Sequence, residues 1–85
     1  MKIEEIIKQA RHLQAEIERT EKSISIAKGA AGAIRLRVIS DSRESHSVIN
    51  PEILIVSLEN QLNEYKEKIA PIEQKLHAIE LMLNS

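Results

Sequence analysis

Three histidines, His12, His46 and His77, are the side chains whose chemistry best suits proton transfer or metal binding. Histidine changes its charge near neutral pH, and its neutral ring binds zinc and related metals. None of the three has a histidine or carboxylate partner at metal-site spacing beyond what chance provides. We therefore interpret them as surface histidines and expect neither a metal site nor a catalytic histidine.

A polar stretch next to His46 contains further groups that nucleophilic catalysis uses, namely Asp41, Ser42 and Ser45. A serine nucleophile requires a base, a third group that orients the base, and an oxyanion hole on a rigid frame. A turn in a chain of 85 residues supplies neither of the last two. The sequence therefore predicts that the protein is not an enzyme and needs no cofactor.

A segment with two glycines, followed by arginines, is the third candidate for chemistry. Glycine lets backbone N–H groups approach an anion closely, and arginine donates two parallel hydrogen bonds to a phosphate. The candidate contacts are Lys28, Arg35, Arg37 and Arg43. The ending of a Walker A loop is missing. Such a site would take a small phosphate-bearing nucleotide. The alternative is that Gly29 ends a helix, Gly32 turns the chain, and the arginines lie on the solvent-exposed side of a strand.

The composition narrows the class of protein. Of the 85 residues, 42% are hydrophobic and 29% are charged, but Tyr65 is the only aromatic residue and cysteine is absent. A core of isoleucine and leucine without aromatic rings suits narrow interfaces between helices. The chain has two glycines and two prolines, which leave few positions for turns. We therefore expect one mainly helical domain.

The charge pattern argues against several partners. A net charge of −1 disfavours nucleic acid, which needs a basic surface, and an anionic membrane. No apolar run approaches the roughly 18 residues that span a bilayer. The first residues, MKIEEIIKQ, are charged throughout and do not form a secretory signal. We therefore expect a cytoplasmic protein.

The N-terminal part repeats apolar residues every three and four positions, as one face of a helix does. The repeat runs from Ile3 to Ala27, and every position except Thr20 is apolar. Gly29 is placed to end the helix in the left-handed conformation that glycine accepts, and Lys28 suits the negative end of the helix dipole. The pattern predicts a helix over residues 2–28.

The C-terminal part has a longer, unbroken repeat of the same kind, which predicts a second helix over residues 51–83. The start of this helix is marked by three residues in succession. Asn50 can cap the helix, Pro51 fits the first helical position, and Glu52 lies in the first turn.

Pro71 lies inside this second repeat, and a proline there removes a backbone donor. The repeat keeps its phase from Ile69 to Ile72, so we expect one helix kinked near Pro71 rather than two helices. The apolar stripes that we call the seam are expected to hold the assembly. The seam residues are Ile17, Ile24, Ile55, Leu58, Leu62, Tyr65, Ile69, Ile72, Leu76, Ile79 and Leu83.

Residues 29–50 join the two helices. Apolar and charged residues alternate from Ile34 to Val38, which is the period of a half-buried strand. Residues 40–45 predict a turn, and residues 46–49 a short returning strand. An isolated two-stranded hairpin is marginal, so we expect this one to pair with a copy of itself or to pack on the helix ends. The alternative is an irregular loop with an extended segment.

The helices carry more apolar residues than one seam can bury. Those off the seam are Ile7, Ala15, Ile26, Ile53, Leu54, Val56, Ala70, Ala78, Leu81 and Met82. Residues 79–83 are apolar nearly all round, and such a helix end is usually buried. We therefore expect self-association into a dimer or a larger helical bundle. The tip around residues 33–49 or the apolar C-terminus would then meet another protein.

The order of helix, strand hairpin with IRLRVIS, and helix starting with NPE resembles a β-type prefoldin subunit in miniature. The chain also resembles small helical-hairpin accessory proteins of bacteriophages and prophages, which are short, cysteine-free and rich in heptads. The first resemblance implies an oligomeric chaperone that holds unfolded clients. The second implies a viral protein in the host cytoplasm that binds a host factor or sequesters a small nucleotide.

The sequence thus predicts a single domain over residues 1–85. We expect an antiparallel two-helix coiled-coil hairpin, mainly α, with a short β-hairpin or extended segment at its tip. The preferred function is that of a non-catalytic, homo-oligomeric protein that binds another protein. A nucleotide-sequestering oligomer and a prefoldin-like chaperone are the alternatives.

Overall fold

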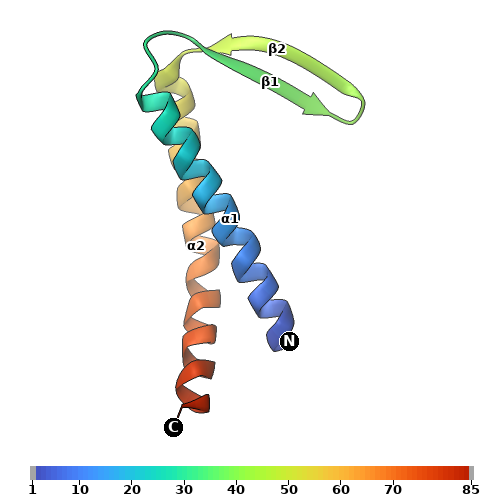
Figure 1. The fold of residues 1–85 in the computed structure, drawn as a ribbon, viewed down its shortest axis with the longest axis vertical. Helices are drawn as coiled ribbons and strands as arrows, with labels where there is room; N and C mark the ends of the chain where they lie inside the picture. Colours follow the sequence, from blue (N-terminus) through green and yellow to red (C-terminus); the bar gives the residue numbers. More distant parts are fainter. Residues whose placement is uncertain (1, 85) are drawn as a thin grey trace.

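The computed structural model describes residues 2–84, which form two helices joined by a β-hairpin (Figure 1). Helix α1 spans Ile3–Lys28, strand β1 spans Ile34–Ser40, strand β2 spans Arg43–Ile49, and helix α2 spans Pro51–Leu83. The helices run in opposite directions, so the start of α1 and the end of α2 lie at one end of the molecule and the hairpin at the other. The predicted mainly helical architecture with strands at its tip is confirmed.

Helix α1 ends where the sequence predicts, but with a different backbone geometry. Gly29 follows the last helical residue with φ −87° and ψ −1°, which is right-handed. Its N–H group bonds to the carbonyl oxygens of Ser25 at 3.3 Å and Ile26 at 3.2 Å. The prediction of a left-handed Gly29 is therefore wrong. The last turn tightens toward a 3₁₀ turn, and this satisfies carbonyl groups without reversing the hand of the backbone.

The segment between the helices is a regular antiparallel hairpin, so the alternative of an irregular loop is wrong. The paired residues run from Ile34 opposite Ile49 to Ser40 opposite Arg43. Both strands are longer than predicted. A two-stranded hairpin has two largely wet faces, so its ladder accepts serine and charged residues that the sequence pattern assigned to a turn.

The loop of the hairpin is shorter than the predicted turn over residues 40–45. It consists of Asp41 and Ser42 alone. Asp41 has a φ of 55°, and a positive φ at the first loop position is typical of the tight turns that close hairpins. Aspartate is one of the few residues besides glycine and asparagine that adopt this conformation readily.

Helix α2 begins as predicted. The side chain of Asn50 accepts a 2.8 Å hydrogen bond from the N–H of Glu52, and Pro51 occupies the first turn, where its missing donor is harmless. The helix runs without interruption through Pro71 to its end. One continuous helix is therefore confirmed, and the alternative of two helices is wrong. Pro71 is exposed, so its ring faces water rather than the other helix.

The core lies between the two helices and is small. The buried residues within the described part of the chain are Ile6, Ala10, Thr20, Ile24 and Ala27 in α1 and Ile69 in α2. Thr20 is polar, but its hydroxyl donates a 2.7 Å hydrogen bond to the backbone carbonyl oxygen of Glu16. A hydroxyl satisfied in this way can be buried without a large penalty.

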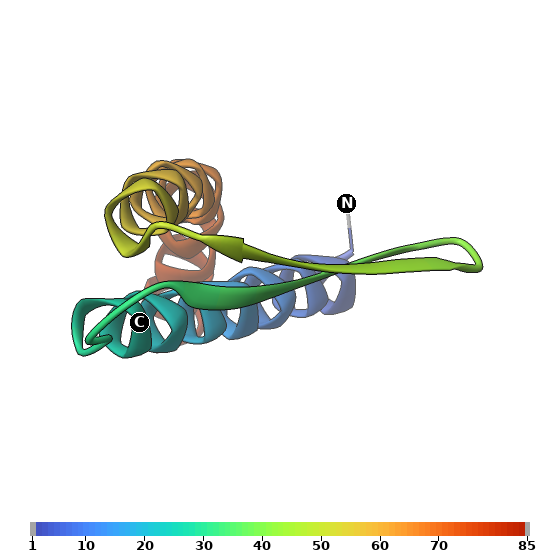
Figure 2. The same cartoon turned by 90° about the horizontal axis from the view of Figure 1, so that it is seen from above.

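The helices converge at the hairpin and diverge toward the free ends (Figure 1). The hairpin crosses the closed end and projects past the helices on one side (Figure 2). The molecule measures 54 × 31 × 14 Å and has a radius of gyration of 17.2 Å. A compact domain of this length would have a radius of gyration of about 12 Å. The chain is therefore an open frame with most of its residues near solvent.

Replacing Ile69 with alanine should lower the free energy of unfolding by about 2–5 kcal/mol, because it empties the buried position of α2. Ile69→Val removes one methylene and should lower it by only about 0.5–1.5 kcal/mol. Urea titrations followed by circular dichroism at one fixed chain concentration measure both. Equal effects of the two variants would show that Ile69 is not packed as described.

Replacing Pro71 with alanine should raise the free energy of unfolding by about 1–3 kcal/mol, because it restores the donor for the carbonyl group of Glu67. No packing is lost, since Pro71 is exposed. Ala78→Pro, at another exposed position of α2, is the matched control and should lower stability by about 3 kcal/mol. A loss of stability in Pro71→Ala would mean that the proline shapes the helix for packing.

Candidate functional site

An apolar groove of about 430 Å³ lies between the diverging ends of the helices. Its apolar walls are Ile3 and Ile7 of α1 and Leu76, Ile79 and Leu83 of α2. Glu73, His77 and Glu80 complete the α2 side. The separation of the helices leaves the outermost walls poorly covered, so that Ile3 is 47% and Leu83 77% exposed. We call this feature the open-end groove.

The open-end groove is suited to binding apolar side chains. Its walls offer aliphatic carbon from two helices, and the polar groups beside it are two carboxylates and one imidazole. An amphipathic helix that docks in such a groove inserts residues spaced three and four apart. The arrangement therefore fits recognition of another helix better than it fits chemistry on a small substrate.

Large apolar side chains also face solvent outside the groove. At the open end Leu81 is 59% exposed. Toward the hairpin, Ile26 is 64%, Ile53 59% and Val56 60% exposed. All four belong to the surplus that the sequence places off the seam. A single exposed apolar residue is ordinary on a protein surface. These four lie near both ends of a chain whose core is small, so they add to the apolar surface that the chain leaves uncovered.

The seam residues lie between the helices of one chain. In α2 each seam residue from Ile55 to Ile79 is buried or half-buried, and Leu83 is exposed. In α1 Ile17 is half-buried and Ile24 is buried. The seam is covered within the chain except at the open-end groove, which Leu76, Ile79 and Leu83 line. A further helix would therefore meet mainly that groove and the surplus residues.

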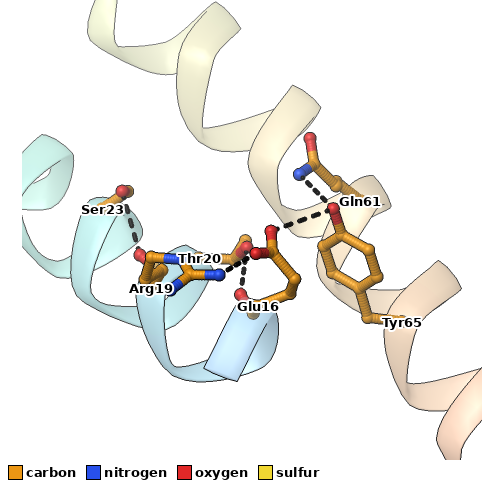
Figure 3. A network of polar contacts seen from close by, with 6 residues as sticks. All are labelled: Glu16, Arg19, Thr20, Ser23, Gln61 and Tyr65. Atoms are coloured by element: carbon orange, nitrogen blue, oxygen red, sulfur yellow. Dashed lines mark hydrogen bonds and ion pairs between the residues drawn. The ribbon is translucent and has the colours of Figure 1, made fainter. Parts of the chain in front are cut away.

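A polar network joins the two helices near their middle (Figure 3). The hydroxyl of Tyr65 donates a 3.4 Å hydrogen bond to Glu16 Oε2 across the interface, and it accepts a 3.0 Å bond from Gln61 Nε2. Arg19 forms an ion pair with the same Glu16 side chain. The seam pattern alone did not reveal this contact, although a single aromatic residue among aliphatic ones marks its position.

The four candidate anion contacts do not form one cluster. Paired strand residues share a face of a hairpin, and neighbours along a strand alternate. Arg35 and Arg37 therefore share one face, while Arg43 lies on the other. Arg37 already forms an ion pair with Glu44. Lys28 is the last residue of α1, outside the hairpin. One chain thus brings only Arg35 and Arg37 together.

The three histidines lie on three different elements, and each is exposed. His12 belongs to α1, His77 lines the open-end groove, and His46 lies in β2 with its Nε2 3.3 Å from Glu44 Oε1. Within residues 2–84, no group of three or more metal-binding side chains comes together.

Comparisons of the chain with protein-family models, with curated proteins and with solved structures gave no match. Neither α1 nor α2, within the described residues, combines the length and hydropathy that crossing a membrane demands.

The bond between Glu16 and Tyr65 should contribute a coupling energy of about 0.5–1.5 kcal/mol, the usual range for a partly buried hydrogen bond. A double-mutant cycle with Tyr65→Phe and Glu16→Ala, each of which removes one partner of the bond, measures it by urea denaturation. Tyr65→Phe with Ser23→Ala is the matched control pair, because the Ser23 hydroxyl bonds only to the Arg19 carbonyl of its own helix. A coupling near zero in the first cycle would mean that the contact does not help to align the helices.

Proposed function

We propose that this protein acts by association: copies of the chain assemble through apolar helix surfaces, and the assembly binds another protein without catalysis. The observation that carries the proposal is the amount of apolar side chain that a single copy leaves in water. The open-end groove and the surplus residues Ile26, Ile53, Val56 and Leu81 are the parts of it that lie on the helices.

The accessible surface of one chain supports this proposal. It amounts to 7007 Å² for a mass of 9.6 kDa. A compact monomer of that mass would expose about 5,100 Å². The excess of about 1,900 Å² exceeds the roughly 800 Å² that each partner buries in a standard protein interface. The open shape of one chain therefore leaves surface that an interface with a second copy would cover.

The form of the apolar surface favours helices as occupants. The groove is bounded by two helices that separate at a shallow angle (Figure 1), and a helix from a second copy would restore the cover that the separation removes. Leu81 lies at the same end of α2, but residues two apart on a helix point to opposite sides. It therefore faces away from the groove walls Ile79 and Leu83 and needs a second helix of its own to cover it. Helical chains commonly complete a core by burying such residues in a four-helix assembly.

The remaining apolar surface near the hairpin is then the candidate site for a different protein. Ile26, Ile53 and Val56 lie toward that end of the helix pair, away from the open-end groove. If the chain is an accessory protein of a bacteriophage, the class that its sequence resembles, this partner would be a host protein.

The wild-type chain should sediment as a dimer or a larger assembly. Leu81→Lys should weaken that assembly by at least about tenfold, because a buried leucine contributes about 1.5–3 kcal/mol and 1.4 kcal/mol corresponds to a factor of ten. Gln74→Lys is the matched control, since it places the same charge at an exposed polar position of α2 and should leave the assembly unchanged. Sedimentation equilibrium over a range of concentrations measures all three.

A wild-type chain that stays monomeric at the highest concentration it tolerates would overturn the proposal. Equal weakening by the two lysine variants would show instead that charge, and not apolar burial, controls the association. Circular dichroism of each variant establishes that its helix content is retained.

A further inference from the structure

The hairpin leaves both of its strand edges open. Strands β1 and β2 pair only with one another, and no third strand lies beside either within the described chain. Each strand has seven residues, so each edge presents a row of unpaired backbone groups. A two-stranded hairpin of this kind is marginal in water, and a third or fourth strand stabilises it.

The turn determines which backbone groups point outward. The residues that flank a two-residue turn, here Ser40 and Arg43, form a hydrogen-bonded pair. Hydrogen-bonded and non-hydrogen-bonded pairs alternate along an antiparallel ladder. The outward groups of β2 therefore belong to Glu44, His46 and Val48. The outward groups of β1 belong to Arg35, Arg37 and Ile39.

Charge distinguishes the two edges. The outward residues of β1 include two arginines and no acidic residue. Pairing β1 with its own copy therefore brings four arginines onto one face, where only the Glu44 of each chain, already paired with Arg37, offsets them. The outward residues of β2 include the acidic Glu44 and the imidazole of His46, two positions apart. A strand with this spacing is complementary to itself when it runs antiparallel about Ser45, the residue between them.

We propose that β2 pairs antiparallel with β2 of a second copy about a twofold axis at Ser45, which places Glu44 of each chain opposite His46 of the other. This inference rests on the self-association proposed above and names one of its interfaces. The two hairpins then form a four-stranded sheet. An imidazole N–H can donate a hydrogen bond to a carboxylate opposite it, and this register makes the pair twice.

The neighbouring registers lack this match. An axis at His46 places the two imidazoles opposite one another and each Glu44 opposite an apolar Val48. An axis at Ser47 places Glu44 opposite Asn50, which is engaged in capping α2. It also brings the ends of the two helix pairs toward the axis. The register about Ser45 keeps both helix pairs outside the paired segment.

A single-cysteine variant tests the pairing directly, because the chain contains no cysteine. In the proposed register Ser45 faces its own copy as a non-hydrogen-bonded pair, with Cα atoms about 4.5 Å apart. This distance lies within the range of a disulfide. Ser45→Cys should therefore cross-link into covalent dimers under mild oxidation, as seen on a non-reducing gel.

Val38→Cys is the matched control, because Val38 is the residue of β1 opposite Ser45 and lies at the other edge of the hairpin. It should cross-link much less than Ser45→Cys. Preferential cross-linking of Val38→Cys would show that β1 is the paired edge and would overturn the proposal.

Amide hydrogen exchange of the wild-type protein gives an independent readout. In the assembly, the N–H groups of Glu44 and His46 should exchange at least about ten times more slowly than those of Arg37 and Ile39. All four are outward groups of the isolated hairpin, so a single chain would not protect one pair over the other. Fast exchange at Glu44 and His46 would overturn the pairing and leave that edge free for a strand of another protein.

The failure of this inference is distinguishable from failure of the proposed function. A wild-type chain that sediments as a monomer removes both. A chain that assembles while Ser45→Cys stays uncross-linked and both β2 amides exchange quickly removes only the strand pairing, and the helix surfaces then account for the assembly.

Discussion

The whole structure depends on the contact of one apolar stripe of α1 with one apolar stripe of α2. The buried residues of the described chain all belong to that contact or to its edges. The hairpin contributes little, since among its strand residues only Ile34, Leu36 and Ile49 are even half-buried. A fold supported by a single narrow interface has no second core to compensate for damage, so its stability is concentrated in a few aliphatic side chains.

Periodicity made most of the fold predictable from the sequence. The unbroken repeat around Ile69 outweighed Pro71, and the local hydrogen bond of Asn50 fixed the start of α2. The ends of β1 and β2 nearest the turn were not predicted, because serine and charged residues in solvent-exposed strands have the composition of a turn. The geometry of Gly29 was missed because more than one kind of terminal turn can satisfy the same carbonyl groups.

The candidate site was less predictable than the fold. The surplus apolar residues, such as Leu81 and Val56, could be found by placing the sequence on a helix. The open-end groove could not, because it arises from the angle between the helices, which no single residue encodes. The link from Tyr65 to Glu16 depends on the relative shift of two helices, and the separation of Arg43 from Arg35 depends on strand register.

The two proposed interfaces lie at opposite ends of the molecule, and this has a geometric consequence. A surface that pairs with itself has a twofold axis, and a chain with two such surfaces carries two axes. If the axes intersect at a suitable angle the assembly closes, and if they do not it grows without limit. The angle between the projecting hairpin and the helices (Figure 1) would therefore decide the size of the assembly.

The position of the chain ends matters for any practical handling of this protein. Ile3, the first residue of α1, and Leu83, the last residue of α2, both line the open-end groove. A purification tag or fluorescent domain fused at either side would hang beside that groove and compete with whatever enters it. A label in the connection between α1 and β1, at residues 30–33, would be carried far from the groove and leave it clear.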